Sequence, residues 1–312
     1  MGAVSVMLPF LPTNGDEVVP YAELVRRGRA VRLWVGQSLT VEPHQALAYV
    51  AGRGIQVPVG TAVTLMPLRQ PFEAAVQARS LALLTGLPVV AGIGVGAERF
   101  VEALRGSGYG SPLTAAAEYV SVMRALLDQR RHSFEGRYFS HRYPLPRLEH
   151  PPVEIGVGVL RKGMAAVAGR VADAAITWLT PADYLAETLI PAMAATAERR
   201  PPKVITQVGL ALTGDPEQAA RAAYGPHLRM PHYVDMLRQA GIAVERPESA
   251  AGRLIERDLL LSGGVDEVVA GIRRYWAAGV DEVMLNVAGV RALHGDEAAR
   301  ADLTDVLAAL EN

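Results

Sequence analysis

Two basic residues follow a glycine-rich strand end and have the chemistry to hold a phosphate. The stretch reads Gly156-Val157-Gly158-Val159-Leu160-Arg161-Lys162-Gly163 and leads from an apolar run into a helical pattern. The first amides of a helix have no partner within the helix, and the helix dipole favours an anion there. We therefore predict that Gly158–Gly163 binds the phosphate of a cofactor. The alternative is an ordinary strand-to-helix turn with a solvated basic pair.

Three glycines end a second apolar run, in the stretch Gly92-Ile93-Gly94-Val95-Gly96. A backbone without side chains can be approached closely by a flat ring or by a ligand chain. Gly94, Val95 and Gly96 are therefore predicted to contact a bound cofactor. A tight turn between a strand and a helix is the alternative explanation.

Two further strand ends carry polar side chains. Gln37 and Ser38 follow one apolar run and could hydrogen-bond a substrate carbonyl, so they are predicted as the catalytic pair. A neutral strand end that faces solvent is the alternative. Arg69 lies between Pro67 and Pro71, where another strand leads into a helix. It is predicted to line the substrate pocket, and a structural salt bridge is the alternative.

The histidines of the chain do not predict a metal site. His132, His141 and His150 lack the spacing that places ligands on one helix face, and no carboxylate cluster lies near them in the sequence. The chain has no cysteine, which excludes disulfides and thiolate ligands. His44 follows Pro43 at a predicted helix start and is interpreted as a cap or surface residue. A serine hydrolase is excluded because no Gly-x-Ser-x-Gly motif is present.

Alternating short apolar runs and longer helical patterns must position these residues. The apolar runs are nearly continuous, as in parallel strands covered on both faces. Eight strand–helix units predict an α/β protein, either a closed (β/α)8 barrel or a doubly wound open sheet. Strands are predicted at Val4–Pro9, Val31–Val35, Val57–Leu65, Val89–Ile93, Val153–Val159, Ala174–Trp178, Val204–Leu212 and Glu282–Val287. Helices are predicted at Tyr21–Arg27, His44–Ala51, Phe72–Leu84, Pro112–Leu127, Gly163–Val171, Ala182–Arg199, Pro216–Gln239, Val265–Ala278 and Ala299–Leu310.

Two stretches are longer than the connections that such units need. Arg130–Pro152 is basic, aromatic and rich in proline, and Gly241–Asp258 precedes the eighth unit. Long insertions commonly shape the functional face of α/β proteins. Arg130–Pro152 is interpreted either as a surface loop held by proline and aromatic packing or as a substrate lid. In the lid, Tyr138 would bind substrate, with Phe139 and Tyr143 beside it.

The composition predicts a single globular domain over residues 1–312. Half of the residues are apolar, and a (β/α)8 barrel needs roughly 250 residues plus insertions. A net charge of −1 argues against a nucleic-acid partner. No apolar run of about 18 residues is present, which predicts no membrane span. The first residues lack the basic start and long apolar core of an export signal, so a cytoplasmic location is expected.

Several segments resemble the bacterial luciferase-like flavin oxidoreductases in sequence, order and spacing. They are "GTAVTLMPLRQPFEAAVQARSLALLTG" (Gly60–Gly86), "VVAGIGVG" (Val89–Gly96), "YGSPLTAAAEYVSVMRALL" (Tyr109–Leu127), "FEGRYF" (Phe134–Phe139), "IGVGVLRKGMAAVAGRVADAAITWL" (Ile155–Leu179) and "GGVDEVVAGIRRYWAAGVDEVMLNV" (Gly263–Val287). The resemblance extends from about Ala30 to the end of the chain. It implies a TIM barrel with insertions at the C-terminal face, and so favours the closed barrel.

The resemblance also implies where the cofactor binds. In the family, the third strand runs beside the flavin ring, and many members have a non-prolyl cis peptide there; the matching bond is Ala62–Val63. The loop that binds the cofactor phosphate in the family matches Gly158–Gly163. Trp178, near the end of the same matching segment, is included among the expected cofactor contacts. Family members are often dimers, which implies a homodimer by analogy only.

The implied chemistry depends on residues that differ from the family pattern. Alcohol-oxidising relatives carry an Asp-His pair where this chain has Gln37 and Ser38, and a glutamate where it has Ala97 with Glu98 adjacent. Alcohol oxidation is therefore not expected. The third-strand, fifth-strand and fourth-helix segments look more like the deazaflavin branch, so coenzyme F420 is expected rather than FMN. The expected reaction is hydride transfer between reduced deazaflavin and an activated C=C or C=N bond of a small or peptide natural product. A proton would come from water, Ser38 or a lid tyrosine.

Two alternatives remain open from the sequence. The first is an FMNH2-dependent monooxygenase, which would need an oxygen pocket and a reductase partner. The second is a non-catalytic barrel that binds a flavin or nothing, favoured by the missing histidine and glutamate. Retention of a cofactor and turnover would separate the second alternative from the enzymes.

Overall fold

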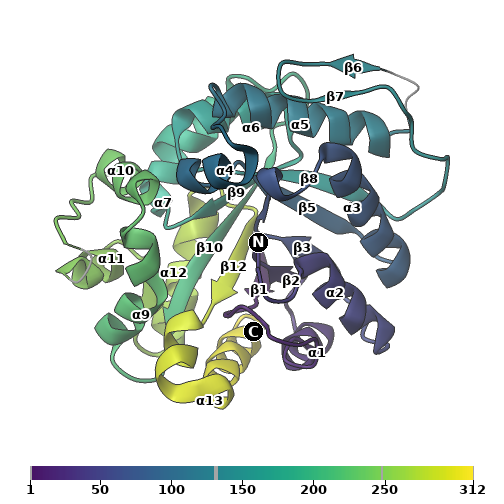
Figure 1. The fold of residues 1–312 in the computed structure, drawn as a ribbon. Coiled ribbons are helices and arrows are strands. Elements are labelled where there is room, and N and C mark those ends of the chain that lie inside the picture. The colour runs from purple at the N-terminus through teal and green to yellow at the C-terminus, as the bar shows by residue number, and fades with distance from the viewer. Residues whose placement is uncertain (1, 130–132, 247–248, 312) are drawn as a thin grey trace.

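Residues 2–129, 133–246 and 249–311 are described in the computed structural model of this protein (Figure 1). Within them, eight parallel strands close into a barrel, because β12 pairs with β1 and β10 pairs with both β9 and β12. The closed barrel confirms the (β/α)8 fold over the open sheet. The barrel strands are β1 (Ala3–Met7), β2 (Leu33–Val35), β3 (Val59–Thr61) with its continuation β4 (Thr64–Leu65), β5 (Val89–Gly94), β8 (Val153–Gly158), β9 (Ala174–Trp178), β10 (Lys203–Ala211) and β12 (Glu282–Asn286).

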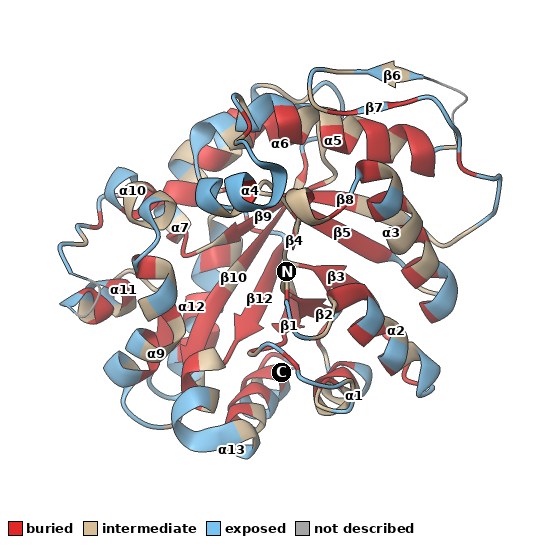
Figure 2. Ribbon diagram, viewed as in Figure 1, coloured by how far each residue is buried: buried red, intermediate tan, exposed pale blue. Residues whose placement is uncertain are grey.

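Helices surround the barrel and turn their apolar sides toward the strands. Figure 2 shows buried residues along the strands and on the inner helix faces, with exposed residues on the outer faces. The helices are α1 (Val19–Arg27), α2 (Pro43–Gly52), η1 (Met66–Leu68), α3 (Pro71–Thr85), α4 (Glu98–Arg105), α5 (Pro112–Leu127), α6 (Lys162–Val171), α7 (Ala182–Tyr184), η2 (Leu185–Leu189), α8 (Ile190–Ala194), α9 (Pro216–Leu228), α10 (Pro231–Gln239), α11 (Ala251–Glu256), α12 (Val265–Ala277) and α13 (Ala288–Ala309).

Side chains fill the interior of the barrel below the carboxyl ends of its strands. Because successive residues of a strand point to opposite faces, every second residue enters the interior. Trp34 lies there, fully buried, and its indole N–H is 2.9 Å from Ser5 Oγ and 2.7 Å from Glu282 Oε1. With the interior filled at this level, the carboxyl ends of the strands are left for a ligand. The interior apolar cluster consists of Met7, Trp34, Val90, Ala174, Ile176, Ile205 and Met284.

The third barrel strand is interrupted between β3 and β4. The Ala62–Val63 peptide is cis, which confirms the predicted bond. The hydroxyls of Thr61 and Thr64, on either side of this peptide, both donate to the Gly92 carbonyl oxygen, at 2.9 and 3.1 Å. Both parts of the strand are therefore fixed to β5, with the cis peptide between them.

Prolines interrupt two of the predicted helices. The pattern Pro216–Gln239 predicts one helix, but α9 and α10 are separate because Pro231 disfavours a helical Met230, which is extended (φ −95°, ψ 120°). The pattern Ala182–Arg199 also predicts one helix. It ends at Ala194 and contains the π-helical segment η2 just before Pro191, whose ring lacks the N–H that a regular helix would use.

The described part of Arg130–Pro152 lies outside the barrel, which fits its interpretation as a surface loop, and its role as a substrate lid stays a prediction. This part contains a hairpin of β6 (Phe134–Glu135) and β7 (Ser140–His141), at the edge of the molecule in Figure 1. The Glu118 carboxylate of α5 accepts hydrogen bonds from three successive backbone N–H groups, those of residues 137–139. Arg79 of α3 donates to the Pro146 carbonyl oxygen. These bonds hold the segment against helices as a surface loop.

Helix α4 is the element that lies in front of the strand ends in Figure 1, and the sequence pattern did not predict it. Its flanking glycines, Gly96 and Gly106, have positive φ angles of 87° and 78°, which other residues rarely adopt. Of its eight residues only Val101 is buried. The long connection after β5, rather than the described part of Arg130–Pro152, therefore borders the mouth of the barrel.

The second long segment, Gly241–Asp258, contains α11 and leads to a short strand, β11 (Leu260–Ser262), that pairs with the end of β10. The terminal helix α13 starts earlier than predicted, at Ala288, and has a kink at Gly295 (φ 85°). Among the described residues, no helix is both long and apolar enough to cross a membrane.

Candidate active site

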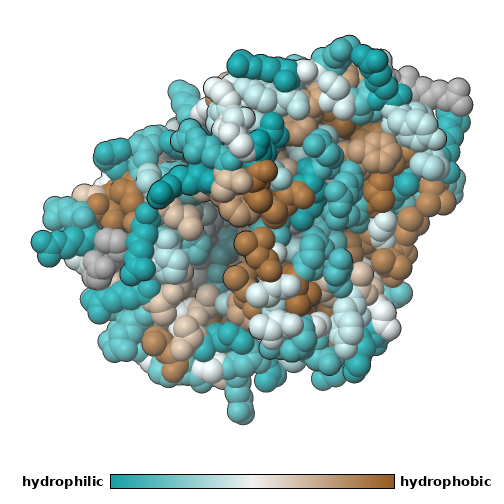
Figure 3. Space-filling view, in the orientation of Figure 1, coloured by the Kyte–Doolittle hydropathy of each residue, from teal (hydrophilic) through white to brown (hydrophobic). Residues whose placement is uncertain are grey.

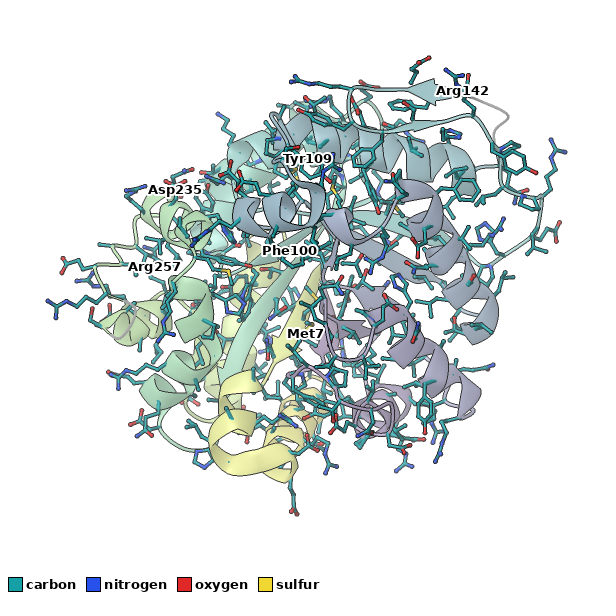
Figure 4. All side chains as sticks on the ribbon, in the orientation of Figure 1. Met7, Phe100, Tyr109, Arg142, Asp235 and Arg257 are labelled. Atoms are coloured by element: carbon teal, nitrogen blue, oxygen red, sulfur yellow. The ribbon has the colours of Figure 1, made fainter. Side chains whose placement is uncertain are left out.

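The carboxyl ends of the barrel strands open into a hollow. Figure 3 shows it near the middle of the surface, with hydrophobic side chains at its edge, where Figure 1 has β10 and β12. Met7, the last residue of β1, lies beside this central region in Figure 4. Ligands of parallel α/β barrels bind at this end, since the strand-to-helix loops meet there. The hollow is therefore the candidate active site.

Gly94 in β5 makes room for Val63 at the hollow, and Gly158 in β8 lies near the same side chain. A Cβ added to Gly94 would lie 2.7 Å from Val63 Cγ2, and one added to Gly158 would lie 3.6 Å from both Val63 methyl groups. Ala62 and Val63 are partly exposed and pack on the interior cluster. The absence of a side chain at Gly94 thus leaves Val63 in its place, and Ala62 and Val63 together present an apolar surface that a flat ring can cover. Gly96, with its positive φ, fits the turn interpretation, and its contact with a cofactor stays a prediction.

The predicted phosphate loop ends at the start of α6. Val159 is buried and its N–H donates to the Ile176 carbonyl oxygen, whereas Lys162 and Gly163 are exposed. The first amides of α6 have no acceptor within the helix. Arg161 Nη1 lies 2.9 Å from Asp235 Oδ2 on α10, so this guanidinium already has an acidic partner. The amides and Lys162 can hold an anion, and Leu160, half-buried, packs beneath them on the main core.

Gln37 and Ser38 are both engaged in hydrogen bonds. Gln37 Nε2 donates to the Ser38 carbonyl oxygen at 2.7 Å, and Gln37 Oε1 accepts from the Leu65 N–H at 3.2 Å. Ser38 is 2% exposed, and its Oγ lies 2.7 Å from Thr40 Oγ1 within its own turn. These bonds fix the end of β2 against β4. The catalytic role of the pair stays a prediction.

Arg69 forms a buried ion pair, as the structural alternative expected. Its side chain is 5% exposed, and Nη2 lies 3.2 Å from Glu42 Oε1. The same oxygen lies 2.7 Å from Nδ1 of His44, which is buried and not at the surface. Burial would raise the pKa of the Glu42 carboxyl, but His44, the Gln45 amide and Arg69 outweigh it and hold the pKa below its usual range. Arg69 thus joins the turn between η1 and α3 to the start of α2.

Trp178 belongs to an aromatic cluster that the sequence did not indicate. Its ring centroid is 5.3 Å from Tyr224 and 5.5 Å from His227, both on α9. His227 in turn lies 5.3 Å from Tyr233 on α10. Burial lowers the pKa of the His227 imidazole, and its Nδ1 is buried without a hydrogen-bond partner. The cluster connects the end of β9 to the helices beside the phosphate loop.

Tyr138 anchors the surface loop to the start of α5. Its hydroxyl oxygen accepts a hydrogen bond of 2.7 Å from the Ser111 N–H, and its ring packs edge-on against Tyr109 at 5.5 Å. Figure 4 labels Tyr109 close to α4. With its hydroxyl in use, Tyr138 has a structural role in this arrangement, and its contact with substrate stays a prediction.

Two carboxamides at the hollow were missed by the sequence analysis. Gln207 lies on β10 two residues after the interior Ile205, and Asn286 lies on β12 two residues after the interior Met284. By strand alternation both side chains point into the barrel. The signal was present in the alternation of each strand, but both segments read as continuous apolar runs.

The sequence predicted no metal site at His132, His141 and His150. Of these, His132 lies outside the described residues. Within residues 2–129, 133–246 and 249–311, no group of three or more His, Asp or Glu side chains has a metal-binding arrangement. The absence of a metal stays a prediction.

Residues 11–282 match the family model of luciferase-like monooxygenases. Since the match covers most of the chain, the protein belongs to this family and is a luciferase-like, flavin- or deazaflavin-dependent oxidoreductase. None of the curated proteins compared with the chain matches it.

Solved structures share the fold at low sequence identity. Monooxygenase RslO1 from Streptomyces bottropensis is 17% identical, with 99% of this chain and 100% of that chain covered and a TM-score of 0.73. The coenzyme F420-dependent tetrahydromethanopterin reductase from Methanopyrus kandleri is 17% identical, with 97% and 96% covered and a TM-score of 0.70. The oxygenating constituent of 3,6-diketocamphane monooxygenase from Pseudomonas putida, in complex with FMN, is 14% identical, with 98% and 96% covered and a TM-score of 0.71. These likenesses establish the fold alone.

Proposed function

We propose that this protein is an F420-dependent oxidoreductase that transfers hydride between reduced deazaflavin and an activated C=C or C=N bond of a small or peptide natural product. The observation that carries the proposal is the lack of a titratable side chain at the two positions where alcohol-oxidising relatives carry an Asp-His pair and a glutamate. Gln37 and Ser38 end β2 and are engaged with backbone and hydroxyl groups, and Ala97 follows β5. Hydride transfer by a deazaflavin needs orientation more than a strong protein acid or base.

The residues at the mouth fit a flavin-type cofactor. When bound, the cofactor supplies the carbon that gives or accepts hydride. Ala62 and Val63 offer an apolar surface for the ring, and the free amides of α6 with Lys162 offer a phosphate site. Trp178 bounds the same region beside α9. The chain's task is to hold the reacting carbons about 3–3.5 Å apart and to exclude water.

An FMNH2-dependent monooxygenase is the second candidate. It is favoured by the family description and by the FMN-bound neighbour. The same apolar surface and phosphate loop suit FMN, because both cofactors have a flat tricyclic ring and a phosphorylated side chain. The two candidates therefore differ in chemistry and not in the fit of these residues.

Labelled cofactor under strict exclusion of oxygen separates the two candidates. The protein is incubated with candidate imines and enones and with reduced F420 that carries deuterium at its hydride position. We expect deuterium in the reduced product, measured by mass spectrometry. Turnover that requires oxygen and reduced FMN, with no transfer of label, would establish the monooxygenase instead.

We also propose a cytoplasmic homodimer without nucleic-acid or membrane partners. The support is analogy with the family and a net charge of −1. Light scattering after size-exclusion chromatography measures the mass, and a monomer at micromolar concentration would contradict the dimer.

A further inference from the structure

Two carboxamides stand next to one another on the inner face of the barrel. β10 and β12 are paired in parallel, with Gln207 opposite Met284 and Gly209 opposite Asn286. Gln207 and Asn286 are thus diagonal neighbours on one face, about 8 Å apart for strands about 4.8 Å apart with a rise of about 3.3 Å per residue. Both strands underlie the hollow of Figure 3.

The hydrogen bonds of Asn286 define which part of its amide is free. Asn286 Oδ1 accepts from the Ala288 N–H at 2.8 Å, at the start of α13. Its Nδ2 therefore remains as a donor, and this side chain, 8% exposed, has no other hydrogen bond within the described residues. A buried amide fixed in this way presents N–H groups in one orientation.

Gln207 has both halves of its amide free. The side chain is partly buried and makes no hydrogen bond with the residues that the structure describes. Its register partner on the other side is Trp178 of β9, so an aromatic residue and not a charge lies beside it. A polar group so placed needs a partner when a ligand displaces water, because an unmade hydrogen bond is costly.

We propose that Gln207 and Asn286 together bind an amide-type edge, a carbonyl oxygen beside an N–H, on the molecule that enters the hollow. Asn286 Nδ2 donates to the carbonyl oxygen, and Gln207 Oε1 accepts from the N–H. This edge occurs in the pyrimidinedione part of a flavin or deazaflavin ring and in peptide-like substrates. The inference rests on the proposed function only in placing a ligand of this chemistry at the hollow.

Small probes test the pair without turnover. Lumiflavin keeps the ring edge but lacks the phosphate chain, and N3-methyl-lumiflavin has the N–H blocked. Glutarimide, tested on protein saturated with FMN or with F420, represents a substrate edge. Calorimetry measures their affinities for the full-length wild type and for Gln207→Leu and Asn286→Asp, the latter keeping the acceptor for the Ala288 N–H. Gln56→Leu, at an exposed position before β3, is the matched control.

If the ring is the source of the edge, lumiflavin binds about tenfold more weakly to Gln207→Leu and Asn286→Asp but not to the control. N3-methyl-lumiflavin then binds all forms weakly. If the substrate is the source, lumiflavin affinity is unchanged and glutarimide binds about tenfold more weakly to both variants. Unchanged affinities for both probes, or a wild type that binds neither, would overturn the proposal. Thermal midpoints equal to that of the wild type exclude misfolding, and Gln207→Met, similar in size and without the amide oxygen, serves if Gln207→Leu fails to fold.

Because no product is measured, this result is independent of the hydride-transfer test. A protein that fails to transfer label can still bind lumiflavin through the pair, and a protein that transfers label can lack this contact.

Discussion

Gly94 shows how one missing side chain can shape a ligand surface. Its φ is not in the left-handed region, so a turn does not require glycine there. The restriction comes from Val63, since a Cβ on Gly94 would lie 2.7 Å from Val63 Cγ2. Real Cβ atoms do not come so close to another carbon, and one of the two side chains must move.

We expect Gly94→Ala to weaken the binding of F420 or FMN by about tenfold, because Val63 would be pushed into the hollow. Fluorescence titration measures the affinity. Gly225→Ala is the control, since a Cβ at Gly225 has no atom within 4 Å. Adding Val63→Ala to Gly94→Ala removes the clashing methyl groups and should restore much of the affinity. Equal affinities in wild type and Gly94→Ala would show that Val63 does not border the cofactor.

Arg69 shows a different outcome at the scale of one residue. Its position between two prolines at a strand end predicted a substrate contact. In the structure, Arg69 Nη2 lies 3.2 Å from Glu42 Oε1, and Nη1 is buried without a hydrogen-bond partner. The ion pair connects the turn before α3 to the residue that precedes α2.

At the scale of elements, the start of α6 is the best candidate for the cofactor phosphate. The backbone amides at the start of α6 are free because of helix geometry alone. The two basic side chains beside them have different surroundings. Lys162 is exposed and has no acidic partner among the described residues. Arg161 is paired with Asp235, and hydrogen bonds from Arg238 and Arg161 lower the pKa of that carboxyl.

We expect Lys162→Glu combined with Arg161→Glu to weaken cofactor binding by more than about tenfold, through repulsion of the phosphate. Asp235→Asn frees Arg161 without reversing a charge and should leave the affinity equal or higher. Fluorescence quenching of the flavin or deazaflavin measures all three proteins. An unchanged affinity in the double variant would refute the phosphate site, and weaker binding in Asp235→Asn would assign Arg161 a purely structural role.

At the scale of the whole molecule, two partly buried histidines link stability to pH. Burial is the main cause that lowers the pKa of the His227 imidazole. Burial, followed by the charge of Arg161, also lowers the pKa of His232. In the unfolded chain both take up a proton near pH 6.5, before the folded chain does. Protons therefore favour the unfolded state in this range.

We expect the urea midpoint to fall as the pH decreases from about 7.5 to about 5.5, with less change in His227→Phe, which keeps a ring beside Trp178. His294→Phe, at an exposed histidine, is the control and should follow the wild type. A midpoint that does not fall over this range, or an equal fall in His227→Phe, would contradict the assignment.

The sequence by itself determined the order and nature of the barrel elements. Ala174–Trp178 and Pro112–Leu127 have the predicted bounds, because an apolar run between breakers and a proline at a helix start are local signals. The cis bond at Ala62–Val63 was predicted from the resemblance and is present. Local signals failed where a proline fell inside a helical pattern, as at Pro231 and Pro191.

Only the tertiary structure decided what each polar side chain touches. Tyr138 and Ser38 carry hydroxyl groups suited to chemistry, but Ser111 and Thr40 hydrogen-bond them in the fold. Asn286 gained its orientation from the first turn of α13, and it neighbours Gln207 only because the last strand pairs with β10 across a long stretch of sequence. A hydrogen-bond partner is a matter of distance in space, which residue type and spacing along the chain do not determine.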